Sequence, residues 1–271
     1  MPYEIMRKRR NGQKCQSDMT EEESEYVGDI RPLTFMDDSD DEDYVFYADH
    51  KSESFEMKTD SFELQLRQDP VLRNRVNKND GLSESEAESA TGAVIWNTSI
   101  ILGMYFVKNF NRDSKSTMRG LELGSGCGAG GILLSIAGCT DVTLTDRKEI
   151  MPLLRENIAT NKDYLSGKVK TSVYRWGKGV ALDGAPFDVI IAADCVYDIE
   201  IVEPLLSSLI DVSNRSTIIY LGWDRSIGFH DVYKTFLDSA KKDFHVEPID
   251  RNDLHVDYDK SSVVVYLMRR K

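Results

Sequence analysis

A chain of 271 residues, 41% of them hydrophobic, is long enough for one α/β domain with a sizeable core and an additional N-terminal segment. Its net charge of −12 at pH 7 provides no global basic field, which argues against nucleic acid as the main partner. No apolar stretch approaches the roughly 18 residues of a membrane span, and the basic start "MPYEIMRKRRNGQ" is not followed by the apolar run of a secretory signal. We therefore expect no membrane partner and no secretion.

The first 50 residues differ in composition from the rest. Residues 1–15 carry a net charge of +4, residues 16–43 carry −11, and the remaining chain carries only −5. Such a polar, charge-segregated segment cannot bury enough apolar surface to offset the entropy lost on ordering. We predict a disordered acidic segment over 1–50, and an acidic segment that docks a basic partner is the alternative.

The cysteines and histidines form no metal-binding pattern. The four cysteines (Cys15, Cys127, Cys139 and Cys195) contain no CxxC pair and no zinc-finger spacing, and the four histidines are scattered. We expect reduced thiols, no metal, and a cytoplasmic protein that is also compatible with the nucleus.

Three elements are expected before the core. Period-2 apolar positions around "TD" in residues 54–69 predict a β-hairpin. Residues 70–91 form a polar connector with turn chemistry. A stripe of apolar residues at three- and four-residue spacing predicts a helix over 93–110.

From residue 117 onward the pattern alternates between strands and helices. The last two strands follow one another with no room for a helix, so they must pair antiparallel. Together the elements predict a doubly wound seven-strand α/β sheet with a C-terminal antiparallel hairpin. The expected strands are 118–124, 141–146, 169–174, 187–194, 216–223, 244–250 and 261–270, and the expected helices are 129–138, 149–161, 203–213 and 228–242.

A glycine-rich loop, "LELGSGCGAGG" at 121–131, lies between the first strand and the first helix of the sheet. Gly124, Gly126 and Gly128 allow a tight turn and let a ligand lie against bare amides. Asp146 follows 20 residues after Gly126, at the end of the next strand, where a carboxylate can bind ribose hydroxyls. This combination indicates a nucleoside cofactor.

The loop alone does not identify that cofactor, because "GSGCGA" also satisfies the dinucleotide pattern G-x-G-x-x-A. S-adenosylmethionine is favoured by Glu122 in E-L-G-x-G-x-G, by a preceding helix that could cover the cofactor, and by the terminal hairpin. An NAD-type oxidoreductase stays open as an alternative. So does a non-catalytic scaffold that binds S-adenosylmethionine and is recruited through its acidic segment.

The stretch "IIAADCVYD" at 190–198 ends an apolar strand on Asp194, with Tyr197 three residues later. This strand should lie beside the glycine-loop strand, so both side chains should emerge near the cofactor's methyl group. A carboxylate there can hold an incoming amine, and a tyrosine ring can face a cation. The alternative is a helix N-cap aspartate with a packing tyrosine. Cys195 and Val196 stand where enzymes that methylate base amines carry two prolines, so no slot for a flat base is encoded.

The motifs "LELGSGCGAGG", "DVTLTDRKEI", "YRWGKG" and "AADCVYD" resemble the seven-β-strand protein-lysine methyltransferases of the methyltransferase-like D-x-x-Y group. Two further stretches, "NKDYLSGKVKTSVYRWGKGV" and "VVVYLMRRK", are most similar to members that modify valosin-containing protein, an AAA-type ATPase. Other relatives act on heat-shock chaperones and elongation factors. The resemblance implies transfer of methyl groups from S-adenosylmethionine to a lysine amine in a protein of one of these classes, by a monomer.

The resemblance covers about 55–271 and implies a methyltransferase domain over 51–271, divided into a hairpin and cap helix (51–116) and a core sheet (117–271). Asn97 stands where the family usually has aspartate, and Asp224 and Arg225 match the family's pattern only loosely. The roles that the resemblance implies are catalytic for Asp194 and Tyr197, and cofactor-binding for Trp96, Glu122, Gly124, Ser125, Gly126, Asp146, Trp176 and Ala193.

Overall fold

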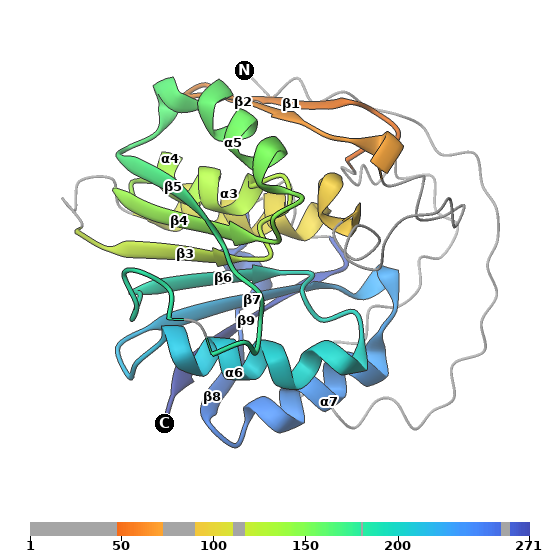
Figure 1. Cartoon of the computed structure of the whole chain (residues 1–271), viewed down its shortest axis with the longest axis vertical. Helices are drawn as coiled ribbons and strands as arrows, with labels where there is room; N and C mark the ends of the chain where they lie inside the picture. The colour runs from red at the N-terminus through yellow and green to blue at the C-terminus, as the bar shows by residue number, and fades with distance from the viewer. Residues whose placement is uncertain (1–47, 73–89, 111–116, 180, 256–260) are drawn as a thin grey trace.

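The computed structural model describes residues 48–72, 90–110, 117–179, 181–255 and 261–271. These residues form a central sheet with helices on both faces and a separate two-stranded hairpin (Figure 1). Most of the predicted disordered segment (1–50) and of the predicted connector (70–91) lies outside the described residues. In the described part of the chain, no helix is long and apolar enough to span a membrane.

The sheet has seven strands in the order β5-β4-β3-β6-β7-β9-β8, which confirms the predicted fold. The first five are parallel, whereas β9 runs antiparallel to both β7 and β8. The strand order reverses between β3 and β6, which is the position where doubly wound sheets bind ligands. The strands are β3 (Arg119–Leu123), β4 (Asp141–Asp146), β5 (Lys168–Val173), β6 (Val189–Ala193), β7 (Ile218–Asp224), β8 (Phe244–Pro248) and β9 (Val263–Arg270).

The helices cover the two faces of the sheet. One group of helices lies on each face of the sheet (Figure 1), and each face has its own buried apolar cluster. Both faces of the central strands are covered, which explains their continuous apolar runs. The first face carries α3 (Asn97–Asn109), α4 (Ala129–Ile136) and α5 (Met151–Thr160), and the second carries α6 (Val202–Val212) and α7 (His230–Ala240).

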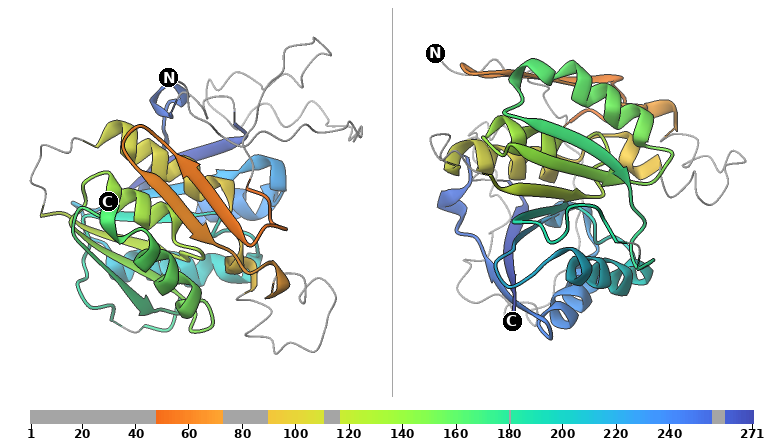
Figure 2. Two further views of the ribbon diagram at one scale, coloured as in Figure 1. Left: turned by 90° about the horizontal axis from the view of Figure 1, so that it is seen from above. Right: turned by 60° about the vertical axis from the view of Figure 1, so that its left-hand side comes forward.

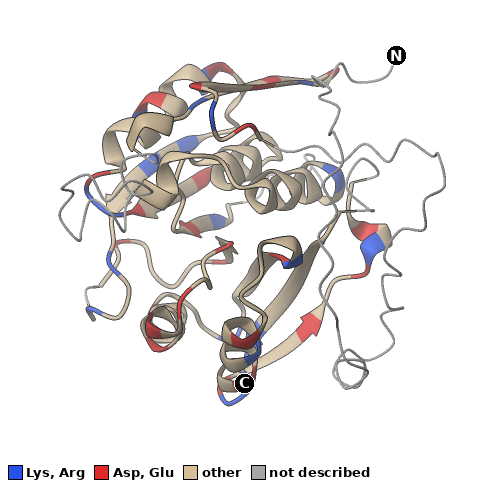
Figure 3. Ribbon diagram, turned by 90° about the vertical axis from the view of Figure 1, so that its right-hand side faces the viewer, with Lys and Arg blue, Asp and Glu red and all other residues tan. Residues whose placement is uncertain are grey.

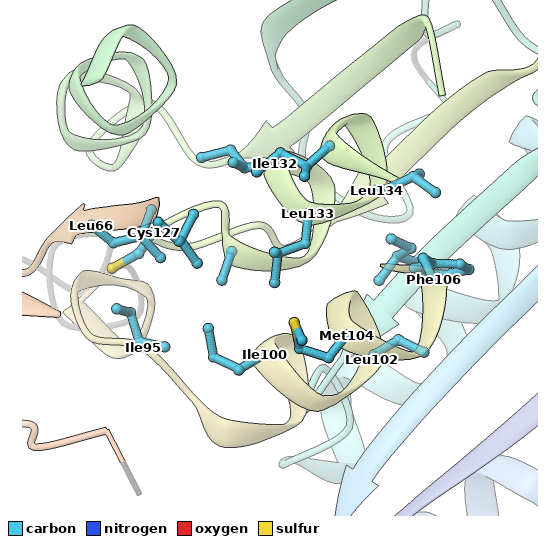
Figure 4. Packing of buried hydrophobic residues seen from close by; sticks show 14 of the residues in the cluster. Leu66, Ile95, Ile100, Leu102, Met104, Phe106, Cys127, Ile132, Leu133 and Leu134 are labelled. Carbon is cyan, nitrogen blue, oxygen red and sulfur yellow. The ribbon is translucent and has the colours of Figure 1, made fainter. Parts of the chain in front are cut away.

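Helices α3 and α4 pack closely because α3 carries a glycine at the contact. A Cβ atom on Gly103 would lie 2.4 Å from a methyl carbon of Leu133. Ile100 and Met104 of α3 lie beside this contact and fill the same cluster (Figure 4). Because this contact fixes α3, it also fixes Trp96, the residue directly before the helix.

The α3 helix begins at Asn97, not at residue 93 as its apolar pattern predicts. Residues 90–93 form a short 3-10 helix, η2, and Trp96 is extended. Hydrogen bonds to distant segments hold the intervening backbone: Ile95 N–H donates to Gln68 Oε1 (2.8 Å), and Ile95 C=O accepts from the ring of His50 (2.8 Å). These long-range hydrogen bonds hold the Ile95 backbone in a non-helical conformation, so α3 begins after it.

The predicted hairpin is confirmed as β1 (Ser54–Lys58) paired antiparallel with β2 (Glu63–Arg67). It lies across the outer side of α5 (Figure 2). Asn157 of α5 and Asn161, the residue that follows α5, form hydrogen bonds to the backbone of β2 as a neighbouring strand would. The Asn157 amide bonds the N–H (2.7 Å) and C=O (3.0 Å) of Arg67, and the Asn161 amide bonds those of Gln65 (3.0 and 2.7 Å).

Asn157→Ala tests this attachment. Asn157 is only 1% exposed and also donates to Cys127 C=O (2.9 Å), so its removal leaves several buried backbone groups without a partner. We expect the free energy of unfolding to fall by about 2–3 kcal/mol in urea titrations. As a control, Glu156→Gln removes only the exposed ion pair with Arg67 and should cost less than about 1 kcal/mol. Equal effects of the two substitutions would contradict the assignment.

Candidate active site

A cavity of about 510 Å³ opens at the carboxyl ends of β3, β4 and β6. This volume lies within the usual range of roughly 300–1,000 Å³ for small-molecule sites. All ten residues to which the sequence assigns a role line this one cavity: Trp96, Glu122, Gly124, Ser125, Gly126, Asp146, Trp176, Ala193, Asp194 and Tyr197.

The glycine loop after β3 forms the floor of the cavity. Gly124 and Gly126 have φ values of +62° and +51°, which favour glycine. A Cβ on Gly124 would come within 3.0 Å of both Cys195 Sγ and the ring of Trp176, so the glycine lets the indole lie against the loop. The Ser125 hydroxyl accepts from Thr145 N–H (3.0 Å) and ties the loop to β4.

Glu122, in β3, is 1% exposed and points under the first turn of α4. Its carboxylate accepts a hydrogen bond from Gly131 N–H (3.0 Å), where the helix dipole favours negative charge. A Cβ on Gly130 would lie 2.4 Å from the carboxylate, so "AGG" provides the space that this side chain needs. Burial nevertheless raises the pKa of Glu122 to about 8. Its contacts fix the loop to the helix.

Asp146 is the last residue of β4, as predicted. Its two carboxylate oxygens accept hydrogen bonds from Gly126 N–H (2.7 Å) and from Arg147 N–H (2.7 Å). Burial raises the pKa of Asp146 to about 6, and these two bonds offset part of the effect. The carboxylate is therefore held at the junction of the glycine loop and β4, facing the cavity.

Asp194 directly follows β6 and adopts a left-handed backbone conformation with φ +50°. Its N–H donates to Gly222 C=O (3.0 Å), and its Oδ1 accepts from Asp224 N–H (2.9 Å). The other oxygen, Oδ2, is buried and accepts no hydrogen bond from the described residues. Burial raises the pKa of Asp194 to about 7, and the nearby Thr98 hydroxyl and the Asp224 N–H offset only part of this rise.

The helix N-cap alternative for Asp194 is wrong in this geometry. Asp198 performs the capping, because its side chain accepts from Glu200 N–H (3.0 Å) at the start of the 3-10 helix η4 (Ile199–Ile201). Asp224, which the sequence left undecided, points away from the cavity and caps η5 (Arg225–Ile227) by accepting from Ser226 N–H (2.9 Å). Only its backbone contributes, by fixing Asp194.

Tyr197 and Trp96 both line the cavity. Burial raises the pKa of Tyr197, so its hydroxyl stays protonated at neutral pH. The Trp96 indole donates to Thr91 C=O (2.9 Å), and His50 packs against it edge-on at 5.1 Å. Next to Trp96, the amide oxygen of Asn97 accepts from Ala48 N–H (2.9 Å). Asn97 therefore anchors an N-terminal segment instead of supplying a charge.

Several residues that line the cavity were not predicted from the sequence. Gly92 approaches Gly126 so closely that a Cβ on Gly126 would lie 2.9 Å from Gly92 C=O. Arg147 and Arg175 follow the ends of β4 and β5, so strand position could have indicated them. Phe229 lies in the connection between β7 and α7, which matches no motif in the sequence.

The charges around the site are mixed. Acidic and basic residues are interspersed along the ribbon of the described chain (Figure 3). Among the described residues, no group of three or more His, Cys, Asp or Glu is arranged to hold a metal ion. Cys127, Cys139 and Cys195 are free and buried, and burial raises the pKa of the Cys195 thiol, which is therefore a packing group.

Comparison with known proteins shows the family of the chain. Residues 77–243 match a family model described as lysine methyltransferase. The chain is 30% identical over 190 residues to protein N-lysine methyltransferase METTL21A of Xenopus tropicalis, covering 67% of this chain and 83% of that protein. It is 31% identical over 174 residues to protein-lysine methyltransferase METTL21E of Bos taurus, covering 61% and 57%.

A solved structure shares the fold. The 16S rRNA N2 G1207 methyltransferase RsmC of T. thermophilus, in complex with AdoMet and guanosine, has a TM-score of 0.52 and 12% identity, covering 80% of this chain and 50% of that one. This likeness concerns the fold alone. The family match decides between the two cofactors that the glycine loop left open, in favour of S-adenosylmethionine.

Asp194→Asn should stabilise the ligand-free protein in a pH-dependent way. The pKa of Asp194 is raised to about 7 in the folded state, so the folded protein keeps a proton that the unfolded chain has already released. The stability that Asp194 contributes by staying protonated in the folded state is fully present below pH 4, and it is lost as the pH rises through 7. We expect Asp194→Asn to raise the melting temperature by about 3 °C or more at pH 8, and by less at pH 5.

Asp198→Asn is the matched control for these thermal melts, since it replaces an exposed capping carboxylate by an equally good cap. It should leave the melting temperature nearly unchanged at both pH values. A gain for Asp194→Asn that is as large at pH 5 as at pH 8 would show that relief of backbone strain, and not of a buried charge, is responsible.

Proposed function

The chain belongs to the lysine methyltransferase family, and from this premise we propose which residues bind the cofactor, which act on the lysine, and which kind of protein is modified. The chain is an S-adenosylmethionine-dependent protein-lysine methyltransferase. The observation that carries the proposed mechanism is the carboxylate of Asp194, a residue that lines the cavity and whose pKa burial raises to about 7.

The residues of the cavity fit the cofactor. Asp146 presents a carboxylate at the end of β4, where ribose hydroxyls can donate to it. The indole of Trp176 lies against the glycine loop and offers an apolar wall to the adenine. Trp96 and Ala193 line the cavity. In this proposal Glu122 and Ser125 act indirectly, because their polar groups hold the loop in place.

The bound cofactor supplies an electrophilic sulfonium methyl group, and the protein has to deliver a neutral lysine amine in line with it. In this proposal Asp194 attracts the lysine ammonium and orients the amine through its carboxylate. Because burial raises the pKa of Asp194 to about 7, the carboxylate can also accept the proton that the ammonium must lose. The ring of Tyr197 faces the cation from the same wall.

For the substrate we propose an AAA-type ATPase similar to valosin-containing protein, with a heat-shock chaperone or an elongation factor as the alternative. The support is the similarity of two stretches, residues 161–180 and 263–271, to enzymes that modify this ATPase. We also propose a cytoplasmic or nuclear location, based on the cysteine content. A fluorescent fusion in cells tests the location.

The substrate proposal is tested with radiolabelled S-adenosylmethionine, the purified enzyme and an extract from cells that lack it. We expect label on one or a few protein bands and, by mass spectrometry, methylation of a lysine side chain. A labelled chaperone or elongation factor would replace the ATPase with the alternative substrate. Label confined to nucleic acid or small metabolites would refute the protein substrate.

Asp146→Ala should weaken binding of S-adenosylmethionine by about 1–3 kcal/mol in calorimetric titrations, because charge-assisted bonds to the ribose are lost. Asp141→Ala serves as the control. Asp141 begins the same strand at the opposite edge of the sheet and pairs with Lys170 (3.8 Å). If both variants bind the cofactor like the wild type, the ribose site lies elsewhere.

Asp194→Asn should reduce turnover on the order of 10²-fold or more while cofactor affinity stays the same, because its partner is the lysine amine. Tyr197→Phe keeps the ring and should cost less than Asp194→Asn if the ring faces the cation. Steady-state rates with the labelled substrate, together with cofactor titrations, measure both effects. Near-normal turnover of a folded, cofactor-binding Asp194→Asn variant would remove this residue from the mechanism.

A further inference from the structure

Backbone strain in the described chain is concentrated at the cavity. Only two of its non-glycine residues have a positive φ, and both line the cavity: Asp194 at +50° and Phe229 at +64°. Strained residues of this kind persist where the surrounding structure holds them for a function. The strain at Asp194 is explained by the amine that it receives. Phe229 has no such explanation in the mechanism.

Phe229 is unfavourable in two further respects. It occupies the N-cap position of α7 without a side-chain capping bond, where Ser, Thr, Asp, Asn or Gly is preferred. Its large apolar side chain is 45% exposed. The preceding Gly228 already has φ +89°, so the turn itself does not require an aromatic residue next to it. Glycine or asparagine would suit the backbone better, so the ring itself must have a use.

The position of Phe229 in the fold indicates that use. The carboxyl ends of β3 and β4 carry the glycine loop and Asp146, so the cofactor lies on that side of the cavity. Phe229 and Ile227 line the cavity from the β7 side, which is the opposite one. Ile199, which is 56% exposed, lies in the neighbouring connection after β6, beside the cavity residue Glu200.

These three apolar side chains have acidic neighbours. The two connections, residues 198–203 and 225–231, contain the acids Asp198, Glu200, Glu203 and Asp231 and the single base Arg225. Apolar residues that stand next to acidic ones in both connections complement a lysine-bearing segment with an apolar side chain next to the lysine.

We propose that Phe229, together with Ile227 and Ile199, forms an apolar rim that binds an apolar side chain adjacent to the target lysine of the substrate protein. The rim is a specificity element of the methyl-transfer site and rests on the proposed function, since it requires a protein substrate. With this rim, the enzyme selects a lysine that has an apolar side chain beside it, and charge attraction alone does not decide which lysine is modified.

Phe229→Gly tests the rim, because glycine adopts a positive φ without strain. We expect an unchanged or higher melting temperature and cofactor affinity within twofold of wild type. At limiting extract concentration, the rate of methyl transfer to the labelled band should fall about tenfold, the scale of one lost apolar contact, and should recover as the extract is concentrated. Phe229→Leu keeps an apolar side chain and should retain most of the rate.

Tyr164→Ala is the matched control, since it removes another exposed aromatic residue, 39% exposed and outside the cavity. It should leave the rate unchanged. Failure of the wild-type enzyme to label any protein would count against the proposed function itself. If the wild type labels a band and Phe229→Gly labels it equally well, the rim is wrong and the function stands. A parallel fall in melting temperature and cofactor affinity would assign Phe229 a structural role and overturn the proposal.

The labelled protein provides an independent test. Once the methylated lysine is known, its apolar neighbour can be replaced by serine. This substitution should reduce the rate of methyl transfer as much as Phe229→Gly does. Combining both substitutions should reduce the rate little further, because they remove the same contact. A methylated lysine with no apolar side chain beside it on the substrate would also overturn the rim.

Discussion

Parallel pairing of β6 with β3 on one side and with β7 on the other is the constraint on which the site depends. β3 ends in the glycine loop, so the chain that leaves β6 emerges beside this loop. β7 extends past the end of β6 and supplies Gly222 C=O and Asp224 N–H to the backbone and side chain of Asp194. Asp194 keeps its strained conformation because both bonds come from a strand in the sheet.

The same strand pairing brings three carboxyl groups into buried positions, where their ionised forms are destabilised. Glu122, Asp146 and Asp194 all lie near the carboxyl ends of adjacent strands, and burial raises the pKa of each. Glu122 and Asp146 recover part of the cost through backbone N–H groups. Asp194 keeps one oxygen free. The cavity therefore holds its least satisfied carboxylate at the end of β6, where the proposed mechanism needs a group that binds the lysine amine.

Much of the architecture could be predicted from the sequence because the relevant signals are local. Strand and helix periods, the glycine loop and the acid after β4 are read from consecutive residues, and the strand count then fixes the sheet. Features that depend on distant partners could not be predicted. The start of α3 is set by Gln68 and His50, and the attachment of β2 by Asn157 and Asn161. Phe229 could not be predicted as a site residue, because its backbone strain and its exposure depend on the fold and not on any sequence motif.

The attachment of the hairpin to α5 bears on how the protein is made. Arg67 and Gln65 bind side chains that follow them by 90 and 96 residues, respectively. During synthesis the hairpin therefore leaves the ribosome well before the helix that holds it. A two-stranded hairpin alone is marginally stable in water, so the newly made N-terminal part has to wait, open to chaperones and proteases, until α5 has emerged. Asn157 also donates to Cys127 C=O of the glycine loop, so the same side chain that holds the hairpin also supports the floor of the cavity.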